Sequence, residues 1–302
     1  MITAVVNDEV KDALRTRSAV VALESTIFSN LGLPSPANRE ALERCLSAIR
    51  ACGAIPAITA VLDGVARIGL DSHEHERILG AARKVAERDL PVAIGAGWEF
   101  GATTVSASLA IAAATGIKVF ATGGIGGVHR GVEQHGDVSA DLAALSHHPV
   151  ATVSAGAKSF LDLPRTLEML ETLSVPVIGY RCNEFPAFTV QSSGLPIPHR
   201  VDDVTVLSRI VASRLATGGG LLVCTPVPSD EAIDSALMDA AIERALADAT
   251  ARGVTGPAVT PIVLAAIAEA TGGAAVRANL ALAENNARLA AELAVRLSSL
   301  AS

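Results

Sequence analysis

The chain has 302 residues, of which 18% are charged and half are hydrophobic, so it is long enough to bury a large core. No apolar run approaches the roughly 20 residues of a membrane-spanning helix, and we expect a soluble protein with a single domain over residues 1–302. The formal charge of −7 and an aromatic content of 3% disfavour nucleic-acid partners, which require basic surface and stacking platforms.

The amino terminus gives no sign of export. Its first 17 residues mix acids with bases, and no basic region is followed by a long apolar core, so we expect a cytoplasmic location. The four cysteines are scattered and none falls in a C-x-x-C pair, which argues against a disulfide framework and a structural zinc site. We expect them to be small core residues.

Short apolar, β-rich runs alternate with stretches of helical periodicity along the chain. Strands are predicted at residues 19–24, 55–62, 92–97, 118–124, 150–156, 175–180 and 221–226. Helices are predicted at residues 37–51, 107–115, 204–217, 230–252 and 275–297. Near-continuous apolar strands are typical of a largely parallel sheet covered by helices on both faces, so we expect an α/β fold. In such sheets, ligands bind at the carboxyl ends of the strands.

Glu24 directly follows the first of these predicted strands and precedes two hydroxyl residues, Ser25 and Thr26. Burial at a strand end would raise the pKa of its carboxyl group and let it deliver a proton near neutral pH. The alternative is a helix cap or a surface carboxylate.

The segment KVFATGGIGGVHRG joins the fourth predicted strand to a glycine-rich stretch that includes His129. Its glycines would let backbone N–H groups approach a phosphate closely. The spacing matches neither a dinucleotide fingerprint nor a P-loop, so a nucleotide cofactor is not indicated. A purely structural glycine loop is the alternative.

Asp137, Ser139 and Asp141 occupy alternate positions in the segment DVSADL. In an extended segment they would share one face and converge on a sugar or on a hard cation such as Mg²⁺ or Mn²⁺. A helix-capping segment with solvated acids is the alternative.

Only four of the 24 basic residues are lysines, namely Lys11, Lys84, Lys118 and Lys158. An amine can lose its proton and attack a carbonyl carbon, whereas a guanidinium stays charged. Lys158 follows another strand end and a run of small residues. Desolvation, or a second cation such as Lys84 or Arg130, would make its amine more nucleophilic. The alternative is a lysine held in a structural ion pair.

Two further segments carry less weight. The run DSHEHE at residues 71–76 favours a solvated helix start over a metal site. Asn285 and Asn286, together with Thr225, would either line a pocket or form hydrogen bonds between elements.

Residues 23–26, 122–131, 137–142 and 154–158 together resemble the pseudouridine-5'-phosphate glycosidases, also called the indigoidine synthase A family. The resemblance continues in family order through GAIPAITAVLDG, RDLP, GATTV, EFPAF, TPIVLAAIAEATGG and NNARLAAE. It implies a three-layer α/β/α sandwich with a central mixed, largely parallel sheet, assembled as a homotrimer. It also implies reversible cleavage of pseudouridine 5'-phosphate to uracil and ribose 5-phosphate through a lysine Schiff base.

On matching positions, the resemblance implies that Glu24 donates a proton, that Lys158 attacks the anomeric carbon and that Asp137 binds one Mn²⁺ per subunit. The implied substrate contacts are Lys84, Val105, His129, Ser139, Ala140, Asp141 and Asn279.

The chain departs from the family pattern at residues 28–32, which replace the usual S-H-G. Bulky Trp98 and Phe100 lie near a proposed substrate contact, and Thr225 stands where an Asn is common. These departures leave two alternatives open. One is a lysine-dependent glycosidase for another phosphorylated C- or N-nucleoside, and the other is a phosphosugar-binding protein without catalytic activity.

Overall fold

The computed structural model describes residues 2–254 and 259–300, and its strands form one 11-stranded sheet. The centre of the sheet is parallel and runs in the order β3-β2-β7-β8-β11-β9-β10. These strands are β2 (Val20–Leu23), β3 (Ile55–Leu62), β7 (Val119–Ala121), β8 (Ala151–Ser154), β9 (Val177–Tyr180), β10 (His199–Val201) and β11 (Leu221–Cys224). Most of them are buried along their whole length, as expected for a parallel sheet with both faces covered.

Four short strands that the sequence did not predict extend one side of the sheet. They are β1 (Val5–Val6), β4 (Val65–Ile68), β5 (Arg83–Val85) and β6 (Phe100–Thr103). Both β4 and β6 pair antiparallel with β3, while β1 joins β4 and β5 joins β6 in parallel. Because β2 pairs with the first half of β3 and β6 with its last two residues on the same edge, β6 runs head-on toward the carboxyl end of β2.

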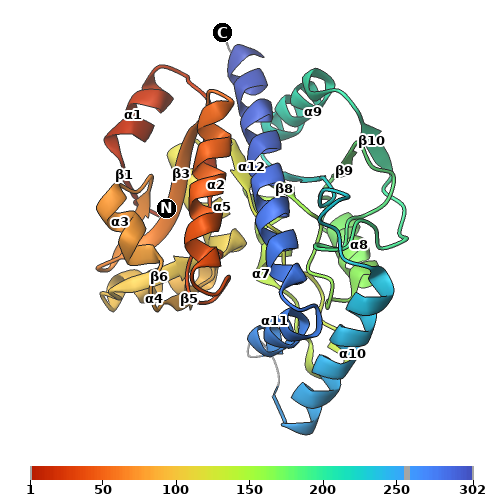
Figure 1. Ribbon diagram of the computed structural model, residues 1–302. Helices are drawn as coiled ribbons and strands as arrows, with labels where there is room; N and C mark the ends of the chain where they lie inside the picture. The colour runs from red at the N-terminus through yellow and green to blue at the C-terminus, as the bar shows by residue number, and fades with distance from the viewer. Residues whose placement is uncertain (1, 255–258, 301–302) are drawn as a thin grey trace.

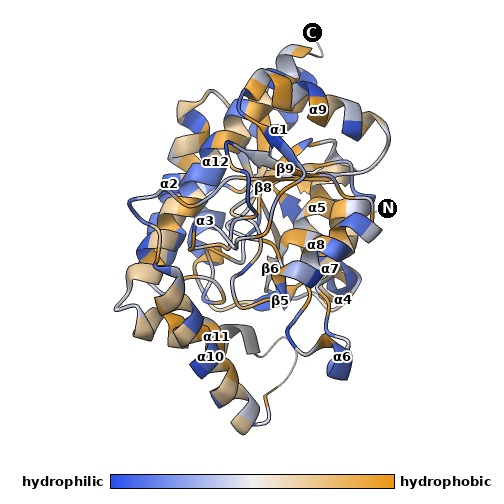
Figure 2. Cartoon of the chain, turned by 90° about the vertical axis from the view of Figure 1, so that its right-hand side faces the viewer, coloured by the Kyte–Doolittle hydropathy of each residue, from blue (hydrophilic) through white to orange (hydrophobic). Residues whose placement is uncertain are grey.

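Helices cover both faces of the sheet, which gives three layers (Figures 1 and 2). One layer holds α2 (Ala37–Ala51), α9 (Val204–Ala216) and α12 (Ala274–Leu300), and the other holds α5 (Val105–Thr115), α7 (Ala140–His147) and α8 (Leu163–Thr172). Helix α12 packs against α2, α9 and the central strands, whereas α5 packs against α7 and the opposite face. The expected α/β fold and its three-layer arrangement are confirmed.

The remaining helices lie around these layers. They are α1 (Asp8–Arg15), α3 (Ser72–Ile78), α4 (Leu90–Gly95), α6 (Val132–His135), α10 (Ser235–Ala251) and α11 (Val259–Ala270), with a 3₁₀ turn at Glu87–Asp89. Helices α10 and α11 pack against each other at the end of the molecule opposite the carboxyl terminus (Figure 1). Within the described residues, none of the helices has the length and apolar character needed to cross a membrane.

The strand predicted at residues 92–97 is wrong, because most of this segment belongs to α4. Pro91 lies in the first turn of that helix, where its fixed φ angle suits the helix and its missing N–H is not needed. A short apolar run has no periodicity that separates a buried strand from a helix.

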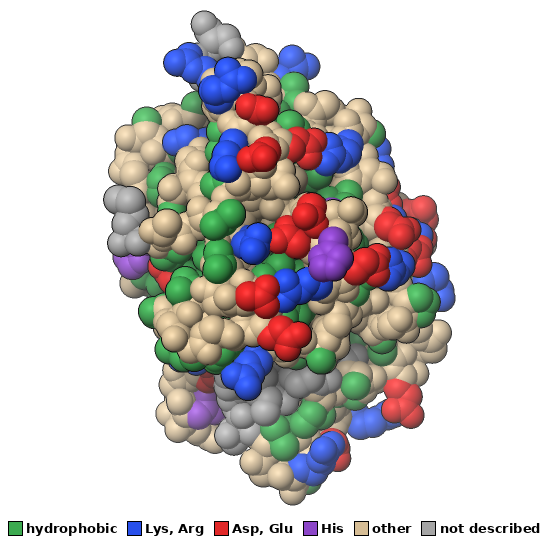
Figure 3. Space-filling view, turned by 90° about the vertical axis from the view of Figure 1, so that its left-hand side faces the viewer, with side chains coloured by type: hydrophobic (Ala, Val, Ile, Leu, Met, Phe, Trp, Pro, Cys, Tyr) green, Lys and Arg blue, Asp and Glu red, His purple; other side chains and the backbone are tan. Residues whose placement is uncertain are grey.

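The surface over the amino-terminal half mixes acidic and basic side chains (Figure 3). Arg39 pairs with Glu76, and Arg77 pairs with Asp63. The Asp71 side chain accepts the Glu74 N–H at the start of α3, so the DSHEHE segment is a capped helix start, as predicted. In residues 2–254 and 259–300, no group of three or more His, Cys, Asp or Glu side chains is arranged to hold a metal ion. All four cysteines are free, and Cys45 and Cys224 are buried.

Candidate active site

Three adjacent strands of the parallel sheet bring the sequence-predicted acid and nucleophile to the same edge. Glu24 follows β2, Thr122 follows β7, and Lys158 comes four residues after β8. These strands are neighbours in the order β2-β7-β8 and run parallel, so their carboxyl ends lie side by side. This edge is where a parallel sheet binds its ligands.

Glu24 is buried, with 8% of its surface exposed. Burial raises the pKa of its carboxyl group, while the charges of Lys158 and Lys84 and a hydrogen bond from Thr122 partly oppose that effect. The Thr122 hydroxyl donates to Glu24 Oε1. The expected burial and upward pKa shift are confirmed, and they favour the protonated acid over the surface carboxylate.

A buried hydroxyl network fixes the chain on either side of Glu24. Ser25 Oγ lies 3.1 Å from Thr103 Oγ1, and Thr103 Oγ1 donates to the Thr59 carbonyl oxygen at 2.7 Å. Thr59 Oγ1 in turn donates to the carbonyl oxygen of Leu23 at 3.0 Å. Because β6 meets β2 head-on, these bonds lock the end of β2 to both β3 and β6 and leave Glu24 little freedom to move.

Lys158 and Lys84 approach Glu24 from different elements. The backbone N–H of Lys158 donates to the Ile125 carbonyl oxygen at 3.2 Å, which ties its turn to the glycine-rich loop. Lys84 lies on β5, opposite Ala102 of β6. Although Lys84 keeps solvent access, surrounding protein lowers its pKa by desolvation, and repulsion from Lys158 adds to this effect. Lys84 and Lys158, two of the four lysines in the chain, therefore belong to one electrostatic cluster.

The amino-terminal ends of α5 and α7 meet at Asp141. Its carboxylate accepts the Ser106 N–H at 3.0 Å and the Gly126 N–H at 2.9 Å. Ser139 caps α7 by accepting the Asp141 N–H at 3.2 Å, so the predicted helix cap is present and the fully extended arrangement is wrong. The solvated acids of that alternative are also wrong for Asp141, whose side chain is buried. Val105 and Ala140 are the first residues of α5 and α7.

Asp137 lies outside α7, in the turn before it, and faces His129. His129 Nδ1 is 3.8 Å from Asp137 Oδ2, and burial lowers the pKa of the imidazole. The Asp137 N–H donates to Nδ1 of His135 at 3.0 Å. One carboxylate with a nearby imidazole fits a hard cation that keeps most of its waters, and it does not fit a closed zinc site.

The glycines of residues 123–127 make room for protein side chains. A β-carbon on Gly126 would lie 2.3 Å from Ser139 Oγ, and one on Gly127 would lie 2.4 Å from Thr166 Oγ1. A β-carbon on Gly124 would lie 2.7 Å from the Phe188 ring. The structure therefore favours close packing over a phosphate cradle as the reason for these glycines.

Sequence reasoning did not single out Thr122, and for Asn286 it left open a place in a pocket lining or a hydrogen bond between elements; the structure shows the hydrogen bond. Asn286 is fully buried on α12, and its Nδ2 donates to the carbonyl oxygens of Thr122 and Gly123. The buried Oδ1 of Asn279, two turns earlier on α12, has no hydrogen-bond partner among the described residues. It would lie 3.5 Å from a β-carbon on Gly123, so it faces the same turn.

The segments that depart from the family pattern pack around β5 and β6. Phe28 is fully buried, and Asn30 Oδ1 accepts the Ala82 N–H at 3.0 Å, so residues 28–32 support the approach to Lys84. The Arg83 guanidinium lies 5.0 Å from the centre of the Trp98 ring, and Phe100 is buried. At another strand end, Thr225 Oγ1 accepts from Asn285 Nδ2 at 3.3 Å.

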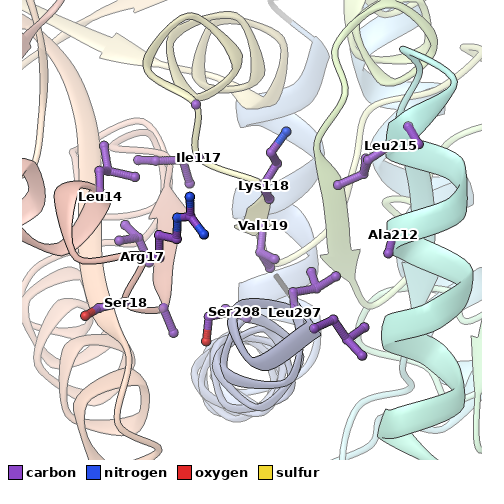
Figure 4. Close-up of a pocket in the computed structure, with 16 residues that line it drawn as sticks. Leu14, Arg17, Ser18, Ile117, Lys118, Val119, Ala212, Leu215, Leu297 and Ser298 are labelled. Carbon is purple, nitrogen blue, oxygen red and sulfur yellow. The ribbon is translucent and has the colours of Figure 1, made fainter. Parts of the chain in front are cut away.

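Two cavities lie at opposite edges of the sheet. One of about 610 Å³ is lined by Arg130 and Ser159, the neighbours of His129 and Lys158 in the chain. The other, of about 470 Å³, lies where β2 and β7 begin and is lined by Lys118 and Leu297 (Figure 4). Neither cavity is lined by Glu24, Lys84 or Lys158, and the first lies beside the turn that carries Lys158.

A buried acid, two lysines and two helix amino termini gather at the carboxyl edge of a parallel sheet, which is where α/β enzymes bind their ligands. A family model described as "Indigoidine synthase A like protein" matches residues 9–296, and the chain belongs to this family. The pseudouridine-5'-phosphate glycosidase of Chloroflexus aurantiacus is 50% identical over 301 residues, which cover 97% of this chain and 98% of that protein. The glycosidase of Caldanaerobacter subterraneus is 47% identical over 299 residues, with 97% and 96% covered.

Two solved structures are similar over nearly the whole chain. The prealnumycin C-glycosynthase, determined in complex with ribulose 5-phosphate, superposes with a TM-score of 0.90 at 38% identity and covers 98% of this chain and 97% of its own. An indigoidine synthase A-like protein from Thermotoga maritima gives a TM-score of 0.87 at 35% identity, with the same coverage.

Proposed function

We propose that this protein cleaves the C–C glycosidic bond of pseudouridine 5'-phosphate to give uracil and ribose 5-phosphate, reversibly. The observation that carries the proposal is the buried Glu24, whose pKa is raised, beside Lys158 and Lys84. Full-length similarity to proteins named for this activity supports it.

The substrate explains why a protonated acid is needed. In pseudouridine the sugar is joined to carbon C5 of uracil, so departure of the base without a proton would leave an unstable carbanion. Glu24 delivers a proton to C5, and the C1'–C5 bonding electrons then leave with a neutral base. The paired-carboxylate arrangement of ordinary glycosidases is therefore not required.

Lys158 takes up the sugar carbon that the base leaves. Its neutral amine forms a bond to C1' as the C1'–C5 bond breaks. One amine proton then passes to O4' as the C1'–O4' bond breaks, which leaves ring-opened ribose 5-phosphate as an iminium ion on Nζ. Water adds to C1', the C–N bond breaks, and the aldehyde of ribose 5-phosphate is released with the neutral amine restored. The proton set free in this step returns to Glu24, which restores the acid. A guanidinium has no such chemistry, which explains a lysine in a chain that otherwise prefers arginine.

The phosphate and the base would be held at different parts of the site. Lys84 and the amino-terminal turns of α5 and α7, at Val105 and at residues 139–141, offer positive charge and backbone donors to a phosphate. Asn279, with its unpartnered Oδ1, offers a hydrogen-bond acceptor to an N–H group of uracil. The charges of Asp137, Lys158 and Lys84 all act on His129, and we assign His129 to the sugar side of the site.

Asp137 would hold one Mn²⁺ per subunit, with water and substrate oxygens completing its coordination. The ion would supply positive charge near the phosphorylated sugar. Electron paramagnetic resonance of Mn²⁺ titrated into the protein should show a bound fraction that Asp137→Ala removes. An Asp137→Ala variant that binds Mn²⁺ as the wild type does would contradict this assignment.

A second enzymatic function keeps the same lysine chemistry on another phosphorylated C- or N-nucleoside. The departures at residues 28–32 and at Trp98, together with 38% identity to a C-glycosynthase, favour testing it. A phosphosugar-binding protein without catalytic activity needs neither an acid nor a nucleophile, so the paired Glu24 and Lys158 argue against it.

The deciding experiment traps the lysine adduct. The protein is incubated with ribose 5-phosphate, reduced with borohydride and mapped by mass spectrometry, and uracil release from pseudouridine 5'-phosphate is measured in parallel with Mn²⁺ present. We expect an adduct on Lys158 and release of uracil. Lys158→Arg should abolish both, while Lys11→Arg, at an exposed lysine paired with Asp8, should leave both intact.

The possible outcomes separate the proposals. An adduct without uracil release would favour another phosphorylated nucleoside as the substrate. Absence of both would defeat the glycosidase proposal, and turnover by Lys158→Arg would show that the nucleophile is assigned wrongly. The family resemblance also leads us to propose a homotrimer in the cytoplasm, and light scattering during gel filtration should give three times the 30.7 kDa chain mass.

A further inference from the structure

Asn286 is placed to hold the turn that follows β7. It lies in the 27-residue helix α12 and is fully buried. Its Nδ2 donates to the Thr122 carbonyl oxygen at 2.8 Å and to the Gly123 carbonyl oxygen at 3.1 Å. A buried amide is costly unless its polar atoms are used. Nδ2 gives both of its bonds to the main chain of another element, whereas the buried Oδ1 has no hydrogen-bond partner among the described residues. The contact therefore fixes the turn rather than α12.

The same turn is bonded to β8 on its other side. The Thr122 N–H donates to the Val153 carbonyl oxygen at 3.0 Å, and the Ala155 N–H donates to the Gly123 carbonyl oxygen at 2.9 Å. The Gly123 carbonyl thus accepts from both Ala155 and Asn286. With its main chain held from two directions, Thr122 has a fixed side-chain direction, and its hydroxyl donates to Glu24 Oε1.

This geometry decides which oxygen of Glu24 carries a proton. Oε1 already accepts the Thr122 hydroxyl, so the acidic proton of the neutral carboxyl group resides on Oε2. We infer that Asn286 is a positioning residue, which acts through Thr122 to direct the acidic proton of Glu24 onto Oε2. The inference rests on the proposed role of Glu24 as the acid.

Burial has the largest effect on the ionisation of Glu24 and raises its pKa, and four neighbouring groups modify that effect. Lys158 and Lys84 favour its charged form, Asp141 opposes it, and the Thr122 hydrogen bond favours it. If the Thr122 hydroxyl turns away from Glu24, burial and the charges of the two lysines and Asp141 remain. Glu24 then keeps its proton to a higher pH. If Asn286 had a purely structural role, its replacement would lower activity without changing the pH at which Glu24 loses its proton.

The experiment measures kcat/KM for pseudouridine 5'-phosphate against pH, with Mn²⁺ present, because this profile reports the groups of the free enzyme. Thr122→Val and Asn286→Leu should each lower kcat/KM about tenfold. Each should also shift the alkaline limb of the kcat/KM profile toward higher pH by about one unit. A shift of this size is the effect of one lost hydrogen bond to a charged group. Because Asn286 acts through Thr122, the double variant should shift the limb no further than either single variant.

Asn285→Leu is the matched control, because Asn285 is the next residue of α12 but bonds to Thr225 and Pro226. It should leave the alkaline limb at the wild-type pH. Thr122→Ser, which keeps the hydroxyl, should do the same. Circular dichroism checks folding, and Asn286→Ala carries the same test should leucine not fit the site.

Two results would overturn the inference. One is an Asn286 variant that is folded and slow but has an unmoved alkaline limb. The other is a double variant whose shift is the sum of the two single shifts. The Glu24→Gln variant distinguishes failure of the Asn286 inference from failure of the assignment of Glu24 as the acid. If this variant is active and its alkaline limb lies at the wild-type pH, Glu24 is not the group that titrates.

Discussion

Glu24 owes its proposed role to where it lies rather than to its residue type. The carboxyl group follows a buried strand, and its burial outweighs the attraction of two lysines, so the neutral form persists to a higher pH than in water. A general acid that works near neutral pH needs this shift. The same shift has a thermodynamic consequence, because a carboxyl group that resists ionisation destabilises the folded state whenever the pH forces it to ionise.

Glu24→Gln should therefore stabilise the protein at neutral pH. Because the folded-state pKa is raised, Glu24 contributes stability below its unfolded pKa of about 4.5, and this contribution is lost as the pH rises through the folded pKa. Glutamine keeps an oxygen that accepts from Thr122 but carries no charge. We expect a gain in unfolding free energy on the order of 1 kcal/mol at pH 7 and almost none at pH 4.5, together with loss of activity. Denaturant unfolding at both pH values measures it, and a variant less stable than the wild type at pH 7 would contradict the expectation.

At the scale of elements, local pattern predicted the central strands and missed those that pair at the sheet's edge. Strands such as β2 and β8 are continuous buried runs, and α2 was predicted with its observed bounds. By contrast, β5 has only one buried residue and depends on pairing with β6. The sequence could therefore single out Lys84 by lysine scarcity but not place it on a strand.

Long-range contacts explain what else sequence reasoning missed. A threonine after a strand and an asparagine in a helix are each ordinary features, and Thr122 and Asn286 are separated by 164 positions. The choice between an extended segment and a helix cap at Ser139 likewise depended on Asp141 finding two backbone donors from α5 and the glycine-rich loop. Local sequence contains neither partner.

Gly156 should be indispensable to the turn that carries Lys158. It has φ +68°, and a β-carbon there would lie 1.9 Å from the Pro186 carbonyl oxygen. Gly156→Ala should cost more than about 3 kcal/mol of stability, or displace Lys158 and abolish activity, because a backbone atom blocks the methyl group. Gly116→Ala is the control, since Gly116 has φ +83° with no atom within 4 Å of the added carbon.

Gly116→Ala should cost only about 1 kcal/mol, from backbone strain, and should keep activity. Denaturant unfolding and the uracil-release assay compare the two variants. Equal losses of stability would show that crowding by the Pro186 carbonyl is not what requires Gly156.

At the scale of the whole molecule, the parallel sheet gathers distant segments at one edge. The candidate site combines residues from the ends of three central strands with the first turns of α5 and α7 and with α12. These elements belong to both helical layers and to the sheet between them (Figure 1). A ligand that contacts them all binds only the folded chain, so its binding free energy adds to global stability.

Ribose 5-phosphate should therefore raise the thermal midpoint of the wild-type protein. At 100 times its dissociation constant it adds about 2.7 kcal/mol, which for a chain of this size corresponds to roughly 4 °C. Lys84→Ala should show a smaller rise at the same concentration, because the phosphate loses a cation while the helix termini remain. Lys118→Ala, at the exposed lysine of the remote cavity, should respond as the wild type does. Ribose without its phosphate should give little shift, and a rise equal to that with ribose 5-phosphate would show that Lys84 and the two helix termini do not bind the phosphate.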